Sequence, residues 1–170
     1  AKRVNMPYVT QRWLGGMLTN FATVRKSIKK MSNIDQMFND GTTDKMAKRE
    51  RLALQREREK LESVLGGITD LNRPPAAVFI VDIVKEHIAM AEANKLEMTS
   101  FAITDTNANP ENPTFPVPAN DDASKSIALI TEKFTDAVEA GLREREEQKK
   151  AKEKEKAEAE AKKADQEGEA

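Results

Sequence analysis

The chain has 170 residues, of which 34% are charged and 38% hydrophobic, and its formal net charge is −1. The absence of cysteine excludes a disulfide framework and a thiolate metal site. No apolar run approaches the roughly 20 residues that cross a bilayer, and no signal-peptide pattern opens the chain, so we expect a cytoplasmic protein.

The cations are concentrated at the start of the chain. Residues 1–34 carry seven Lys and Arg and no Asp or Glu, whereas residues 71–142 carry five cations and eleven anions. This gradient predicts that a polyanion such as RNA binds at the first region and is repelled by the later one. A basic helix face that is merely solvated gives the same pattern, and this alternative stays open. The candidate RNA contacts are Lys2, Arg3, Arg12, Arg25, Lys26, Lys29 and Lys30.

The segment from Arg12 to Phe21 reads Arg-Trp-Leu-Gly-Gly-Met-Leu-Thr-Asn-Phe. Its glycine pair allows positive φ and the close approach of another backbone. A polar residue at its end can cap a following helix, and the guanidinium of Arg12 matches the geometry of a phosphate. We take as its structural signature residues Trp13, Gly15, Gly16, Thr19, Asn20 and Phe21.

Trp13 is the one tryptophan of the chain. It is either a core anchor that docks the loop or a stacking platform for an unpaired base, and packing is the favoured interpretation. With so few aromatic residues nearby, we expect RNA to be recognised by shape and phosphate, not by base sequence.

Two helices follow the signature. Apolar residues recur every three or four positions from Phe21 to about Phe38, and Asp40-Gly41 then breaks the pattern. A second helix is expected to start near Thr43 or Asp44 and to end where Gly66-Gly67 adopts the left-handed conformation. Each arm of about 20 residues is roughly 30 Å long, so residues 20–68 are predicted to form an antiparallel coiled-coil hairpin. The charged run 56–60 is expected on its outward faces.

Beyond residue 69 the pattern is typical of a parallel α/β domain with right-handed crossovers. The expected elements are a strand at 76–81 buried on both faces, a helix at 85–96, strands at 99–104 and 114–117, and a helix at 121–142 capped by Asp121 or Asp122. Residues 7–10 are a candidate for one more strand. The predicted division is therefore a signature loop and domain edge at 1–19, the hairpin at 20–68, the α/β domain at 69–142 and a charged tail at 143–170.

Several of these motifs resemble the bacterial small-subunit ribosomal protein two family, over roughly Met6 to Ile130. They are Trp-Leu-Gly-Gly with Leu-Thr-Asn-Phe at 13–21, Pro-Pro-Ala-Ala-Val-Phe-Ile-Val-Asp at 74–82, Glu-His-Ile-Ala at 86–89, Asp-Thr-Asn at 105–107 and Pro-Val-Pro-Ala-Asn-Asp-Asp-Ala at 116–123. The resemblance implies a flavodoxin-like sheet with the hairpin inserted. Because family members normally carry a long preceding segment, the sheet is expected to be incomplete here, and this piece is not expected to fold robustly by itself.

The resemblance also implies a structural role in the small ribosomal subunit, with no reaction and no cofactor. It implies a position on the solvent side where the head meets the body, close to small-subunit ribosomal protein one. The hairpin tip, around residues 39–43, is the part most available to a protein partner.

Two other functions stay open. A nucleotide- or metal-binding regulatory domain with a coiled-coil interaction arm would use Asp82, Asp105 and Asn107 at the ends of parallel strands, where such sheets bind ligands. However, no glycine-rich loop follows a predicted strand, and Asp and Asn are ordinary capping residues there. A protein scaffold would use the hairpin alone. His87 is the single histidine of the chain and is interpreted as a packed or hydrogen-bonded helix residue.

Overall fold

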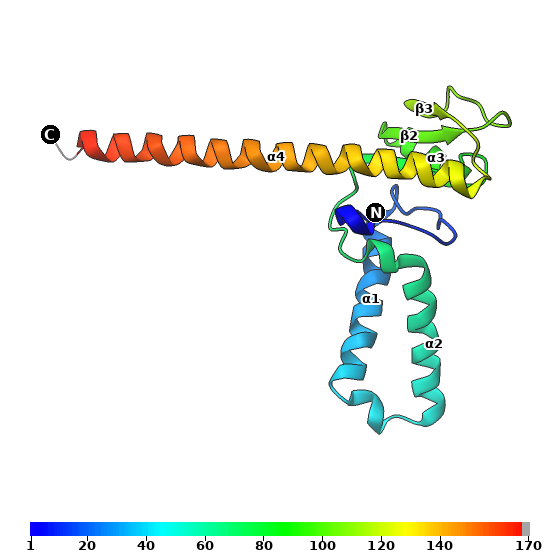
Figure 1. The fold of residues 1–170 in the computed structure, drawn as a ribbon. Helices are drawn as coiled ribbons and strands as arrows, with labels where there is room; N and C mark the ends of the chain where they lie inside the picture. Colours follow the sequence, from blue (N-terminus) through cyan, green and yellow to red (C-terminus); the bar gives the residue numbers. More distant parts are fainter. Residues whose placement is uncertain (168–170) are drawn as a thin grey trace. The chain divides into compact units, whose positions relative to one another are not determined.

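The computed structural model describes residues 1–167 of the chain. It contains two compact units, the first covering Ala1–Ile127 and the second starting at Ala128, and each is described by itself. The first unit contains a pair of long helices, a three-stranded sheet and a shorter helix (Figure 1).

The two long helices lie side by side and are joined by a short connection (Figure 1). Helix α1 spans Phe21–Asn39 and helix α2 spans Lys48–Leu65. The predicted stripe of α1 faces inward, since its buried residues are Val24, Ile28, Met31 and Ile34. Periodic apolar residues therefore placed α1 correctly to within one residue of its end.

The predicted start of α2 was wrong, whereas its end was placed correctly at Gly66 but with the wrong conformation. Residues Thr42–Lys45 form a separate 3-10 helix, η2, and α2 begins after Ala47. At the other end, Gly66 has right-handed φ and ψ, and the chain continues in a further 3-10 helix, η3, over Gly66–Ile68. The positive φ lies at Gly41, directly after α1, where the chain must reverse.

The sheet is parallel throughout, as predicted, which confirms the α/β fold. Strands β1 (Ala77–Ile80), β2 (Thr99–Thr104) and β3 (Phe115–Pro118) lie in the order β1-β2-β3. Phe79, Phe101 and Phe115 occupy one row across the three strands, and the last two rings stack with their centroids 4.9 Å apart. Strand β1 is less buried than expected, because Ala77 is exposed.

Helix α3, His87–Lys95, connects β1 to β2 and packs on the sheet. Its Ala89, Met90 and Ala93 form one buried cluster with Ile80 and Ala102. A second buried cluster lies at the base of the hairpin and contains Met17, Val24, Ile28, Leu65 and Ile68. The side chain that packs against both clusters is Trp13.

The start of the chain lies against the hairpin base. A short 3-10 helix, η1, spans Lys2–Val4, and residues 7–10 do not form the extra strand that was suggested. Instead, the N–H of Tyr8 donates to the carbonyl oxygen of Gly67 over 3.0 Å.

Helix α4 spans Ser124–Glu167 and continues beyond residue 142 without a break. It does not begin at Asp121 or Asp122: the side-chain oxygen of Asn120 accepts the N–H groups of Asp122 and Ala123 instead. Four-residue ion pairs such as Arg143–Glu139 and Lys150–Glu146 lie along it. A glycine at position 168 is expected to end any helix, but this position falls outside the described residues. Over residues 1–167, every helix is too short or too polar to cross a bilayer.

Candidate nucleic-acid interface

The signature loop closes around the carboxylate of Glu92, which comes from α3. One carboxylate oxygen accepts the N–H of Gly16 at 2.6 Å, and the other accepts the N–H groups of Leu18 and Thr19 at 2.9 and 3.0 Å. The Thr19 hydroxyl lies 3.2 Å from Glu92 and the Trp13 indole Nε1 lies 3.4 Å from it. Five donors of one short loop thus converge on a single acidic side chain.

This arrangement keeps Glu92 ionised although its side chain is buried. Burial favours the neutral acid and by itself raises the pKa of Glu92, but the N–H groups of Thr19, Gly16 and Leu18 outweigh it. The net pKa of Glu92 is therefore below its ordinary value. Successive N–H groups that converge on an anion form the type of nest that holds phosphates in other proteins, and here its occupant belongs to the chain itself.

The glycine pair has unequal roles in this loop. Gly16 has φ of +91°, a conformation that glycine adopts without strain, and its N–H is one of the donors to Glu92. Gly15 has open space where a side chain would begin. Asn20 stands at the N-cap of α1 but caps no N–H with its side chain, which accepts from the Thr23 hydroxyl instead.

Several of the seven predicted RNA contacts are engaged within the protein. A guanidinium N–H of Arg25 donates to the carbonyl oxygen of Leu71 over 3.0 Å, and Lys30 pairs with Glu57 across the hairpin. The ammonium of Lys2 lies 5.7 Å from the centre of the Tyr8 ring. Arg25 in particular is partly buried, and its contact joins α1 to the segment that leads into the sheet.

Three other candidates are exposed to solvent and unpaired in the described part of the chain. Arg12, Lys26 and Lys29 are exposed, and no residue in the described part of the chain forms an ion pair with them. Lys26 and Lys29 lie one turn apart on α1, and Arg12 lies directly before the loop that leads into this helix. Arg3 is exposed in η1.

The predicted RNA contacts did not include a second row of cations, on α2, although the run 56–60 was expected on its outward faces. Arg49, Arg56 and Lys60 are exposed and are spaced by seven and four residues, which places them on one face of the helix. The charge counts concealed this row because residues 35–70 as a whole carry eight acidic residues against seven cations. The helical spacing of the cations alone would have revealed it.

Two residues expected on outward faces of α2 instead pair with α1. Arg58 donates to Asp35 over 2.6 Å, and Glu57 is the partner of Lys30. The hydrogen bond and the charge of Asp35 raise the pKa of Arg58, against a small opposing effect of burial. The two arms of the hairpin are therefore joined by ion pairs as well as by apolar packing.

The carboxyl ends of the strands carry the acidic residues that the nucleotide or metal alternative requires. Asp82 accepts the N–H groups of Val84 and Lys85, and Asp105 accepts the N–H of Thr106. Both are thus ordinary capping residues of turns, which is the interpretation that the sequence favoured over a ligand site. Among the side chains that the structure describes, those of residues 1–153, no group of three or more acidic or histidine residues is arranged to bind a metal ion.

Asp121 differs from its neighbours because it is buried and one of its carboxylate oxygens has no hydrogen-bond partner in the described structure. Burial, and then the charges of Asp82, Asp105 and Asp122, raise its pKa. By contrast, the pKa of Asp82 is lowered: burial opposes this, but hydrogen bonds from the backbone and side chain of Lys85 outweigh it. His87 is exposed, and its Nδ1 lies 3.3 Å from the carbonyl oxygen of Val84, so it is a hydrogen-bonded helix residue.

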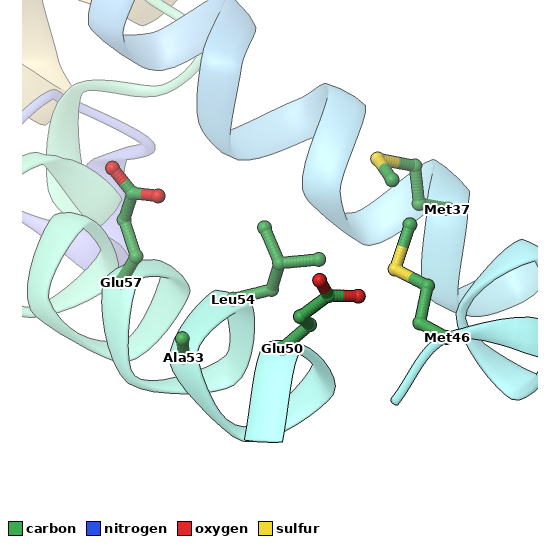
Figure 2. Close-up of a pocket in the computed structure, with 6 residues that line it drawn as sticks. All are labelled: Met37, Met46, Glu50, Ala53, Leu54 and Glu57. Atoms are coloured by element: carbon green, nitrogen blue, oxygen red, sulfur yellow. The ribbon is translucent and has the colours of Figure 1, made fainter. Parts of the chain in front are cut away.

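An open pocket of about 400 Å³ lies between the two arms near the hairpin tip. Figure 2 shows Leu54 pointing from α2 toward the α1 side, with Met37 and Met46 on one side of it and Glu57 on the other. Glu50 and Ala53 complete the lining. Methionine side chains are flexible, and Met37 and Met46 leave this pocket open between the two arms.

Comparison with known proteins identifies close relatives. The model of the family described as ribosomal protein S2 matches residues 1–141. Proteins named small ribosomal subunit protein uS2 are similar to 85% of the chain: that of Cytophaga hutchinsonii is 60% identical, that of Flavobacterium johnsoniae 56% and that of Parabacteroides distasonis 54%. The matched part covers 57%, 57% and 52% of these relatives, respectively. The chain therefore spans little more than half the length of the curated relatives it matches.

Proposed function

The chain belongs to the ribosomal protein S2 family, and from this membership we propose that it is a structural constituent of the small ribosomal subunit in the cytoplasm. In this proposal it binds small-subunit ribosomal RNA, supports translation and catalyses no reaction. Its partners are that RNA and neighbouring small-subunit proteins, including small-subunit ribosomal protein one.

The observation that carries the RNA proposal is the division of the basic residues into paired and unpaired sets. Arg25 and Lys30 are engaged in contacts within the protein, whereas Arg12, Lys26 and Lys29 are exposed without an ion-pair partner among the described residues. Unpaired cations bind phosphates at a lower cost, because no internal contact has to be broken first. We therefore assign the main phosphate contacts to these three, with the α2 row of Arg49, Arg56 and Lys60 as an addition.

We further propose that the sheet is part of a flavodoxin-like fold and that α1 and α2 form an inserted coiled-coil hairpin. The parallel order β1-β2-β3 and the ion pairs between the two helices support this assignment. The acidic carboxyl ends of the strands are the side that we expect to face a protein partner and not RNA.

The experiment is a salt titration of binding between the full chain and small-subunit ribosomal RNA. The double variant Lys26→Glu, Lys29→Glu should bind more weakly and lower the slope of log K against log salt by about 0.9 for each phosphate that the protein no longer neutralises. Its matched control is Lys125→Glu with Lys133→Glu, which reverses two cations outside the basic region. Equal affinity of the wild type and the first variant would contradict the proposal, and saturable heat on titration with magnesium and nucleotides would support the regulatory alternative.

A further inference from the structure

We propose that Glu92 is a positioning residue for RNA binding, which fixes the loop of residues 13–19 and thereby sets Arg12 and Lys26 in one arrangement. This inference rests on the proposed function. Glu92 itself is buried, and a carboxylate repels phosphate, so it acts through the loop that it holds.

The loop of residues 13–19 connects Arg12 to the helix that carries Lys26. Arg12 lies directly before Trp13, and α1 begins at Phe21, directly after the loop. Between these points the chain makes a turn with positive φ at Gly16, and the turn has two local backbone hydrogen bonds, from Met17 to Leu14 and from Asn20 to Gly16. These local bonds shape the turn but do not attach it to the sheet. The orientation of this turn, and with it the direction of α1 relative to the sheet, therefore depends on the contacts that attach the loop to the rest of the protein.

Glu92 attaches this loop to a distant part of the sequence. It lies 76 residues beyond Gly16 and belongs to α3, whose buried face packs on the sheet. Its two carboxylate oxygens accept three backbone N–H groups and lie within reach of two side-chain donors. Charge-assisted hydrogen bonds of this kind are roughly twice as strong as neutral ones, and a rigid helix carries the acceptor.

The same contacts determine which groups meet the RNA. The N–H groups of Gly16, Leu18 and Thr19 would suit a phosphate, but Glu92 already occupies them. RNA phosphates are left to the exposed cations on either side of the loop. A rigid loop between the cations lowers the entropic cost of binding RNA. The loop can therefore tighten binding although it does not itself contact the RNA.

The test uses the full chain with Glu92→Gln and Glu92→Ala, and Glu111→Gln as the matched control, because Glu111 is an exposed carboxylate in a loop. Binding to small-subunit ribosomal RNA, transcribed from the Cytophaga hutchinsonii sequence, is measured at low temperature, where circular dichroism shows each variant to be folded. The Glu92→Ala variant is measured in sodium formate and in sodium chloride at equal ionic strength, because formate can replace the missing carboxylate.

We expect Glu92→Gln to bind about tenfold more weakly than the wild type while folded, with Glu111→Gln unchanged. Formate should restore part of the affinity of Glu92→Ala, and chloride should not. The inference is overturned if folded Glu92→Gln binds as the wild type does and only melts at a lower temperature, or if formate restores the melting temperature without the affinity. Failure of the proposed function is a separate result, since the wild type itself would then not bind the RNA.

Discussion

Tyr8 lies directly against Gly67, with its backbone N–H bonded to the Gly67 carbonyl oxygen over 3.0 Å. A side chain at position 67 would overlap the Tyr8 carbonyl oxygen and come within 2.9 Å of ring carbon Cδ2. The start of the chain is therefore attached to the base of the hairpin through a position where glycine is needed for space and not for its φ angle.

The first prediction follows from that lack of space. Gly67→Ala should destabilise the protein by about 3 kcal/mol or more, because the obstructing atoms include backbone that cannot rotate away. Gly15→Ala is the matched control, since nothing lies within 4 Å of its Cβ position, and it should change stability by less than about 0.5 kcal/mol. The prediction is checked by measuring the melting temperatures of the two variants. Similar melting temperatures would show that Tyr8 moves aside and that position 67 does not need glycine.

The second prediction concerns the ion pair between Arg58 and Asp35. Their side chains are 37% and 38% exposed, so solvent screens the pair strongly despite its short distance of 2.6 Å. A double-mutant cycle with Arg58→Met and Asp35→Asn should give a coupling free energy of about 0.5 kcal/mol, measured by denaturant unfolding. A coupling above about 2 kcal/mol would mean that the pair is shielded from water.

Local patterns predicted the regular elements well. The three-four spacing of apolar residues located α1, and the short β-branched runs located β2 at both of its ends. The α2 boundary was misplaced because Thr43 and Asp44 are good capping residues, yet the chain uses them in a 3-10 turn before the helix begins. Propensity identifies residues that can cap a helix, but tertiary contacts decide which one does.

The central contact of the candidate site could not be predicted from the signature. Glu92 reads as one more polar residue in a short helix, and its partners lie more than 70 residues earlier. The sequence signal was indirect: the loop contains several N–H donors and no acidic residue to meet them. Likewise, nothing local distinguishes Arg25, which bonds to Leu71, from the exposed Lys26 beside it.

The third prediction is the pH dependence that Glu92 produces. Its pKa is lower in the folded than in the unfolded protein, so the folded state gains stability above the ordinary value of 4.5 and loses it as pH falls through the folded pKa. The melting temperature of the wild type should therefore fall more steeply below about pH 4.5 than that of Glu92→Gln. Parallel curves for the two proteins would show that the carboxylate is not held ionised by the loop.

The fourth prediction has the opposite sign and concerns Asp121. Burial and the charges of Asp82 and Asp105 raise its pKa, so the ionised form costs stability once pH rises above the ordinary value of 3.8. Asp121→Asn removes the charge and offers an amide to the neighbouring carboxylates, so it should raise the melting temperature at pH 7. At pH 3 the gain should vanish, and a gain of equal size at both pH values would exclude a charge effect.

The fifth prediction compares the adjacent cations Arg25 and Lys26, which should contribute to different properties. Arg25→Met removes a hydrogen bond to the Leu71 carbonyl oxygen, so it should lower the free energy of unfolding by about 1 kcal/mol and leave the salt dependence of RNA binding nearly unchanged. Lys26→Met removes an exposed charge, so it should leave stability within about 0.5 kcal/mol and reduce the salt slope by about 0.9. Both variants lose one positive charge from neighbouring positions of α1, so a general effect of net charge would change their RNA binding equally. That equal change is the result that would refute the division into structural and RNA-binding cations.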